Sequence, residues 1–317
     1  MMSKNKPFKV AVVQAGSIVM DKEATVNKTI QLIKEAGKNQ AKIILFPEAF
    51  ISAYPRGMSF GAKVGSRSPE GRKDFARYSE SAITIPGAET EAIGKAVKEA
   101  GAYVVIGVIE KDAAYSGGTL YCTALFFGPD GSILGKHRKL KPTGSERLIW
   151  GEGDGSTLPV FDTPYGRIGA LICWENYMPL ARAAMYTKGV QIYLAPTADA
   201  RDSWLASMRH IALEGRCFVL SCNQYSTKAM YPQDIVERAE FADLDDECSR
   251  GGSCIVSPLG EFIVEPVVGK EEIIYAELNL DQITESQFDF DVVGHYARPD
   301  VFQLLVNEEK KEHTKFF

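Results

Sequence analysis

Cys173 is the side chain in this 317-residue sequence that is best placed for covalent chemistry. It ends the apolar run RIGALIC and precedes the polar turn Trp174-Glu175-Asn176, after which Pro179 opens a predicted helix. A thiol at the carboxyl end of a strand faces the crevice in which α/β proteins bind ligands, and the backbone N–H that follows it can stabilise an oxyanion. The pattern therefore favours a nucleophile, with a small buried cysteine as the alternative interpretation.

A thiol nucleophile needs a base, because a free thiol has a pKa of about 8.5 and is little ionised at neutral pH. Glu48 is the most informative acid, since it follows Pro47 at the end of an apolar run, and apolar surroundings raise a carboxyl pKa toward the general-base range. A buried glutamate bound to an amide or a basic side chain is the alternative. A Cys–His pair also stays open, although each histidine has an ordinary structural or solvated explanation. The four histidines are His137, His210, His295 and His313.

A basic stretch, GKHRKLKPT at residues 135–143, contains candidate partners for that carboxylate. Composition alone does not select among Lys136, Lys139 and Lys141, and a basic cluster of this size is usually a solvated face. Glu146 follows shortly afterwards and has no distinguishing surroundings of its own. From composition alone, the basic stretch therefore indicates that Glu48 has a basic partner but does not identify which lysine it is.

The composition points to a small-molecule ligand. With 45% apolar residues the chain can bury a large core, and a formal charge of −5 argues against nucleic acid or an anionic membrane as partner. No 18 apolar residues run together, and the opening MMSKNKPFKVAVVQ has no apolar targeting segment, so we expect a cytoplasmic protein. The six cysteines show no metal-binding or redox spacing, and we expect no disulfides and no metal.

The elements that position these residues alternate between strands and helices, which indicates an α/β fold. Turns containing proline at 127–132, 162–167 and 256–261 predict hairpins, so the sheets should be mixed, and about ten strands would form one oversized sheet or two stacked ones. Helical spacing is present at 24–33, 93–100 and 203–215. The predicted strands are residues 8–13, 42–46, 103–109, 120–127, 167–173, 190–195, 217–222, 252–257, 261–264 and 272–278.

No repeat or linker divides the chain, so residues 1–317 are predicted to form a single domain. The glycine-rich stretch 55–81 is predicted to be a long binding loop. Residues 306–317 are predicted to be a short charged tail that frays or meets a neighbouring subunit.

Taken together and in order, four segments resemble the nitrilase branch of the carbon–nitrogen hydrolase superfamily. They are LFPEAF around Glu48, HRKLKPT around Lys139, SERLIWGEGDGS around Glu146 and ALICWEN around Cys173. Further similar stretches are AYPRG (53–57), LAPTAD (194–199) and DFDVVGHYARPD (289–300), and the resemblance covers nearly the whole chain. Within the branch, the sequence is most similar to plant-like nitrilases that act on arylacetonitriles or cyano amino acids.

The resemblance implies a four-layer αββα sandwich and a catalytic triad of Glu48, Lys139 and Cys173, with Glu146 as an additional glutamate. It implies hydrolysis of a nitrile to a carboxylic acid and ammonia through a thioimidate and a thioester on Cys173, without a cofactor, in a homodimer or larger homo-oligomer. An amidase and a hydratase-type activity that stops at the amide are the alternatives.

Three aromatic residues near these motifs are candidates for the walls of a substrate pocket, because ligand pockets are mostly apolar. They are Tyr54, Trp150 and Trp174, and ordinary core packing is the alternative for each.

Two other classes of function are disfavoured. A non-catalytic scaffold on the same fold would lack a member of the triad, and none is missing. A nucleotide-binding enzyme is suggested only by the glycine-rich GEGDGS, which lacks the Lys-Ser/Thr ending of a phosphate-binding loop.

Overall fold

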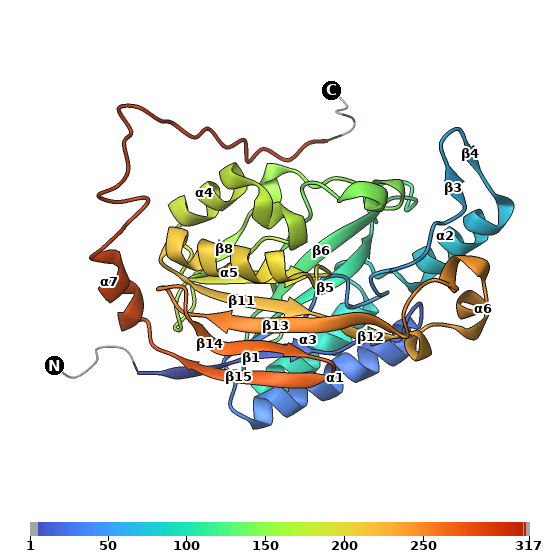
Figure 1. Cartoon of the computed structure of the whole chain (residues 1–317), viewed down its shortest axis with the longest axis horizontal. Coiled ribbons are helices and arrows are strands. Elements are labelled where there is room, and N and C mark those ends of the chain that lie inside the picture. Colours follow the sequence, from blue (N-terminus) through green and yellow to red (C-terminus); the bar gives the residue numbers. More distant parts are fainter. Residues whose placement is uncertain (1–5, 313, 315–317) are drawn as a thin grey trace.

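The computed structural model describes residues 6–312 and 314, and most of its strands form two large mixed sheets (Figure 1). The first sheet has the order β15-β1-β2-β5-β6-β7, with parallel pairing among β1, β2 and β5 and antiparallel pairing elsewhere. Its strands are β1 (Phe8–Gln14), β2 (Ile43–Leu45), β5 (Tyr103–Lys111), β6 (Leu120–Phe127), β7 (Ile133–Arg138) and β15 (Glu272–Leu278).

The second sheet has the order β12-β13-β11-β10-β9-β8, and β14 also pairs with β13. Its centre, β9 to β11, is parallel, and the hairpins that the prolines predicted join β6 to β7, β8 to β9 and β13 to β14. The strands are β8 (Val160–Phe161), β9 (Ile168–Ala170), β10 (Ile192–Thr197), β11 (Phe218–Asn223), β12 (Tyr225–Thr227), β13 (Glu247–Val256) and β14 (Phe262–Val268).

The two sheets pack face to face, and helices cover both outer faces, so the predicted αββα sandwich is confirmed (Figure 1). Alternation along a strand explains the layers. In β10, Ile192 and Leu194 enter the core between the sheets, whereas Tyr193 and Ala195 face the helices. The helices α1 (Lys22–Lys38) and α3 (Ala88–Ala100) cover the first sheet, and α4 (Pro179–Thr187) and α5 (Asp202–Gly215) cover the second.

The prediction of one long loop over 55–81 was wrong in its second half, which contains the helix α2 (Pro69–Ser81). Ser68 accepts a hydrogen bond from the Gly71 N–H and Pro69 occupies the first helical turn, which is a strong helix start. Gly57, Gly61 and Gly65 precede this helix, around a small hairpin, whereas Gly71 lies in its first turn. The hairpin strands are β3 (Ala62–Lys63) and β4 (Ser66–Arg67), and the remaining α-helices are α6 (Gln233–Val236) and α7 (Asp281–Gln287).

After α7 the chain contains turns but no helix or strand through residue 312, and we call residues 289–312 the C-terminal arm (Figure 1). Its far end is attached to the body, since the Lys311 N–H donates to Asp154 and Glu308 pairs with Lys188. Its middle exposes Phe302 and Leu305, at 78% and 90% of their surface. Part of the predicted tail, residues 313 and 315–317, lies outside the described residues.

Two features bear on the environment of the chain. No helix in the part that the structure describes is long and apolar enough to cross a bilayer. All six cysteines are buried free thiols.

Gly107 in β5 positions the segment that follows β2. Its N–H donates to the Pro47 carbonyl (3.1 Å), and its own carbonyl accepts from the Phe50 N–H (2.8 Å). A Cβ at this position would lie 2.2 Å from the Pro47 oxygen and 2.7 Å from the Glu48 Cα, both of which are backbone atoms. Only glycine therefore lets the segment that carries Glu48 approach the sheet this closely.

Replacing Gly107 with Ala should lower the free energy of unfolding by about 1–3 kcal/mol, the usual cost of overpacking, because the backbone must move. Urea denaturation followed by tryptophan fluorescence measures the change. Gly118→Ala is the control, since a Cβ there meets only the Ser116 hydroxyl at 3.5 Å. Equal midpoints for the two variants would contradict the role given to Gly107.

Candidate active site

The structure brings Glu48, Lys139, Glu146 and Cys173 together where the two sheets meet. Glu48 follows β2, and Lys139 follows β7, in the first sheet, whereas Cys173 follows β9 in the second. Lys139 Nζ donates to Glu48 Oε1 (2.6 Å) and to Glu146 Oε2 (2.8 Å). The side chains of Glu48 and Lys139 are completely buried. The site is thus assembled from both sheets around one ammonium group.

Burial makes the two carboxylates around Lys139 a requirement, since an unpaired charge in such a place is very costly. Burial alone acts to lower the pKa of Lys139, but the charge of Glu48, helped by the other nearby acids, outweighs it and holds this pKa well above its ordinary value. Lys139 is therefore an ammonium ion that donates hydrogen bonds and does not act as a base.

Glu48 has the properties of a general base. Burial raises the pKa of its carboxyl group above the ordinary 4.5, and Glu146 adds to the rise while Lys139 opposes it. Its Oε1 accepts from Lys139 and lies 3.6 Å from the thiol of Cys122. Its Oε2 is buried and has no hydrogen-bond partner among the described residues. One oxygen is therefore fixed, and the other is available to accept a proton.

Cys173 occupies a strained turn that the sequence did not predict. Strand β9 ends at Ala170, three residues earlier than predicted, and Cys173 has φ = +51°, a left-handed conformation that costs roughly 1–3 kcal/mol in a residue with a Cβ. A short 3₁₀ helix, η3 (Cys173–Tyr177), begins at this residue. The turn presents the sulfur at the strand end and leaves the first amides of the helix without acceptors inside it.

Asn176 holds this turn in place. Its Nδ2 donates to the carbonyls of Leu171 (2.9 Å) and Cys173 (2.8 Å), and its Oδ1 accepts from the Tyr193 hydroxyl (2.7 Å). All these groups are buried. The strain at Cys173 is therefore balanced by hydrogen bonds from its own turn and from β10.

The thiol of Cys173 is protonated at rest. Burial, helped by the charge of Glu48, raises its pKa to about 12, although Lys139 acts in the opposite direction. The Thr197 hydroxyl, at the end of β10, donates to the sulfur at 3.3 Å. The nucleophile must therefore lose its proton to a neighbouring base as it attacks.

Glu146 is fixed by the 3₁₀ helix η1 (Gly144–Leu148). Its Oε2 accepts from the Thr143 N–H (2.6 Å) as well as from Lys139, and its Oε1 accepts from the Tyr54 hydroxyl (2.8 Å). Tyr54 is therefore held directly against the acidic cluster. Burial, with the charges of Glu146 and Glu48, raises the pKa of this tyrosine above its ordinary value, so it stays neutral and donates.

A cavity of about 420 Å³ opens onto the sulfur. Trp174 forms part of its wall, with its Nε1 donating to Asp199 (2.8 Å) and the Arg201 guanidinium 4.9 Å from the ring centre. The lining residues are Tyr54, Arg56, Thr143, Glu146, Cys173, Trp174, Ala198, Asp199, Ala200 and Arg201.

Trp150 does not line this cavity. It is buried behind Tyr54, in edge-to-face contact at 5.8 Å between ring centres, and its ring lies 5.6 Å from Lys139 Nζ. A second cavity of about 430 Å³ shares Tyr54, Arg56 and Glu146 with the first and extends along residues 55–60. The first part of the predicted binding loop therefore does border the site.

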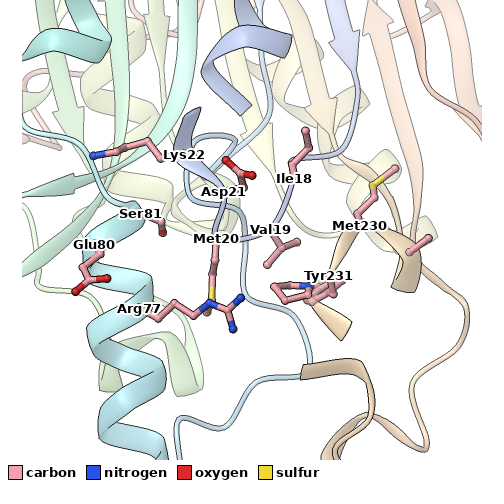
Figure 2. Close-up of a pocket in the computed structure, with 12 residues that line it drawn as sticks. Ile18, Val19, Met20, Asp21, Lys22, Arg77, Glu80, Ser81, Met230 and Tyr231 are labelled. Atoms are coloured by element: carbon pink, nitrogen blue, oxygen red, sulfur yellow. The ribbon is translucent and has the colours of Figure 1, made fainter. Parts of the chain in front are cut away.

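A larger hollow of about 630 Å³ lies elsewhere, between residues 18–22, α2 and residues 229–232 (Figure 2). None of the predicted site residues lines it. Three of its charged groups are already engaged, since Lys22 pairs with Glu89, Arg77 pairs with Asp234, and Asp21 caps α1. It holds no arrangement of nucleophile and base, and we do not assign the reaction to it.

Sequence reasoning missed Thr197, Asn176 and Asp199 as parts of this site. Two of them lie in LAPTAD, a stretch that stood out only through resemblance, and the third, Asn176, comes three residues after Cys173 in ALICWEN. Their roles depend on hydrogen bonds across β10 and the Cys173 turn, which no local pattern reveals. In the part of the chain that the structure describes, no group of three or more His, Cys, Asp or Glu residues is arranged to hold a metal ion.

Comparison with known proteins agrees with this geometry. Residues 9–288 match the carbon–nitrogen hydrolase family. An aliphatic nitrilase of Sinorhizobium fredii is 58% identical, and the match covers 96% of this chain and 97% of the nitrilase. A bifunctional nitrilase/nitrile hydratase of Nicotiana tabacum is 49% identical, and the match covers 99% of this chain and 90% of that protein.

The fold also has known counterparts. The crystal structure of Saccharomyces cerevisiae Nit3, a member of the nitrilase superfamily, superposes with a TM-score of 0.72 at 24% identity and covers 92% of this chain and 97% of its own. The chain therefore belongs to the nitrilase branch of the carbon–nitrogen hydrolase family and is a hydrolase of carbon–nitrogen bonds other than peptide bonds.

Proposed function

We propose that this enzyme hydrolyses a nitrile to the carboxylic acid and ammonia, with Cys173 as the nucleophile. The observation that carries the proposal is one buried cluster of a cysteine, a carboxylate and an ammonium group, beside a cavity that Cys173 and Glu146 line. The 58% identity to an aliphatic nitrilase supports a nitrile as the substrate.

In the first half of the reaction, Glu48 Oε2 accepts the thiol proton while the sulfur of Cys173 attacks the nitrile carbon. The product is a thioimidate, and the negative charge that develops on the nitrile nitrogen is stabilised by Lys139 and by the Trp174 N–H. Glu48 returns its proton to that nitrogen. The raised pKa of the Glu48 carboxyl group suits both transfers.

In the second half, water adds to the thioimidate carbon and gives a tetrahedral intermediate. Ammonia leaves with a proton from the acidic cluster, and a thioester remains on Cys173. A second water, activated by Glu48 and positioned with Glu146, releases the acid and restores the thiol. If the intermediate expels the thiol instead, the product is the amide.

We infer that Tyr54 and Trp174 form the walls against which the substrate lies, with Trp150 supporting Tyr54 from behind. Tyr54 also places one of these walls next to the catalytic residues, because its hydroxyl donates a hydrogen bond to Glu146. The adjoining cavity along residues 55–60 gives room for a longer nitrile.

An ammonia-release screen across aliphatic nitriles, arylacetonitriles, cyanoalanine and the matching amides tests this function, with acid and amide products measured separately. We expect turnover of nitriles and none after Cys173→Ser, because hydroxyl and thiol differ greatly in nucleophilicity. Mass spectrometry should detect an acyl or imidate adduct on the peptide that contains Cys173. Appreciable turnover by the serine variant, or turnover of amides alone, would refute the proposal.

The pH profile tests the role of Glu48. This carboxylate must be ionised to accept the thiol proton, and because its folded pKa is raised, the ionised form is lost at a higher pH as the solution is acidified. We therefore expect the acid limb of kcat/KM to have its midpoint above 4.5, the ordinary value. Circular dichroism at each pH excludes unfolding as the cause. A midpoint at or below the ordinary value would speak against Glu48 as the base.

We further propose that residues 1–317 act as one domain, in the cytoplasm, as part of a homodimer or larger homo-oligomer. The six free cysteines support a reducing compartment. The exposed apolar side chains of the C-terminal arm support the oligomer, because an arm attached at both ends that exposes Phe302 and Leu305 is best explained by a second copy packing on it.

Analytical ultracentrifugation tests the assembly. The double substitution Phe302→Ser and Leu305→Ser should reduce the subunit number, because it removes apolar surface from the proposed contact. Val64→Ser is the matched control, since Val64 is an exposed apolar residue in the turn between β3 and β4, away from the arm (Figure 1). A monomeric unmodified protein, or an unchanged subunit number in the double variant, would rule out this role for the arm.

A further inference from the structure

Two residues that the mechanism does not use, His137 and Glu175, are completely buried beside the catalytic residues. His137 lies on β7, two residues before Lys139, and Glu175 lies in η3, two residues after Cys173. His137 belongs to the first sheet, whereas η3 follows β9 of the second sheet, and His137 Nε2 is 2.8 Å from Glu175 Oε2. Because alternate residues of a strand share a face, His137 lies on the Lys139 side of β7, while Lys136 and Arg138 pair with Glu110 on the other side.

The Glu175 carboxylate joins the main chains of the two catalytic segments. Its Oε1 accepts from the N–H of Leu140, the residue after Lys139, at 2.5 Å. Its Oε2 accepts from the N–H of Ile172, the residue before Cys173, at 2.6 Å. A single rigid group therefore determines how far apart the two segments lie.

His137 completes this arrangement. Its Nδ1 faces the carbonyl oxygen of Thr157 and its Nε2 faces the carboxylate, so both ring nitrogens meet acceptors. A neutral imidazole has one N–H, whereas the cation has two, and only the cation satisfies both contacts. Burial opposes the charge, but Glu175 raises the pKa of His137 above its ordinary value. The Glu175 carboxylate thus has a charged partner in His137 while it accepts hydrogen bonds from the segments that follow β7 and β9.

We propose that His137 and Glu175 form a positioning clamp that sets the separation of Lys139 from Cys173. This inference rests on the proposed catalytic roles of those two residues. Apolar residues would fill the same space at a similar or lower cost to folding, but they could not bind the amides of the two segments that follow β7 and β9. A displacement of about 1 Å at such a site reduces turnover by about 100-fold.

Glu175→Gln tests the clamp, because the side chain keeps its shape but turns a donor toward one of the two amides. We expect kcat to fall by about 100-fold with KM changed by only a few-fold, since the lost geometry matters in the transition state. Alkylation of Cys173 by iodoacetamide should also become slower at fixed pH. Urea denaturation measures stability in the same preparation.

Glu110→Gln is the matched control. Glu110 is also a buried carboxylate, bound to Lys136, Arg138 and Thr123, but its partners belong to the same sheet. We expect this variant to lose stability while its kcat stays within a few-fold. If both variants lower kcat in proportion to stability, or if Glu175→Gln keeps its kcat, the clamp is refuted.

His137→Gln gives an independent test in case Glu175→Gln does not fold. It removes the positive charge and leaves only one donor group for two acceptors, so kcat should fall, and the double variant should lose less than the sum of the two single losses. An unchanged kcat would overturn the proposal. The Cys173→Ser variant distinguishes failure of the proposed function from failure of the clamp. Turnover by that variant would refute the proposed function. An inactive serine variant together with a fully active Glu175→Gln variant would refute the clamp alone.

Discussion

The buried ammonium group of Lys139 is the constraint on which the rest of the site depends. It has no contact with water, and the two carboxylates that balance it come from two separate segments. Each segment therefore needs its own support: Gly107 lets the Glu48 segment lie against β5, and η1 holds Glu146 through the Thr143 amide. Removing either carboxylate would leave a buried N–H donor of Lys139 without its acceptor, so the same contacts that organise the chemistry also hold the fold together.

The second sheet contributes the sulfur, and it does so from a strained conformation. Positive φ at Cys173 is maintained by the hydrogen bonds of Asn176 and by the contact with Thr197. Because burial keeps the thiol protonated at rest, the reactive thiolate forms only beside a substrate and a base. This limits oxidation, since susceptibility to oxidants follows thiolate character and exposure.

Much of the fold could be predicted from the sequence, because long apolar strands and helices have clear periodicity. The ten predicted strands all correspond to strands of the two sheets. Strand β7 was indicated only by its hairpin turn, and β3, β4, β8 and β12 are too short, at two or three residues, to show a pattern. The residue types at Glu48 and Cys173 suggested their chemistry. Lys139 and Glu146 were selected only by resemblance, and the Trp150 position depends on packing behind Tyr54, which spacing along the chain does not specify.

The placement of the reacting groups on two different sheets has a consequence for how the enzyme matures. A partly folded chain with either sheet formed alone would contain every side chain in question and still have no competent centre, because the sulfur and the ammonium group approach each other only when the sheets dock. Catalysis therefore requires that both sheets have formed and docked, and the first sheet includes β15 from near the end of the chain, paired with β1 from near its beginning.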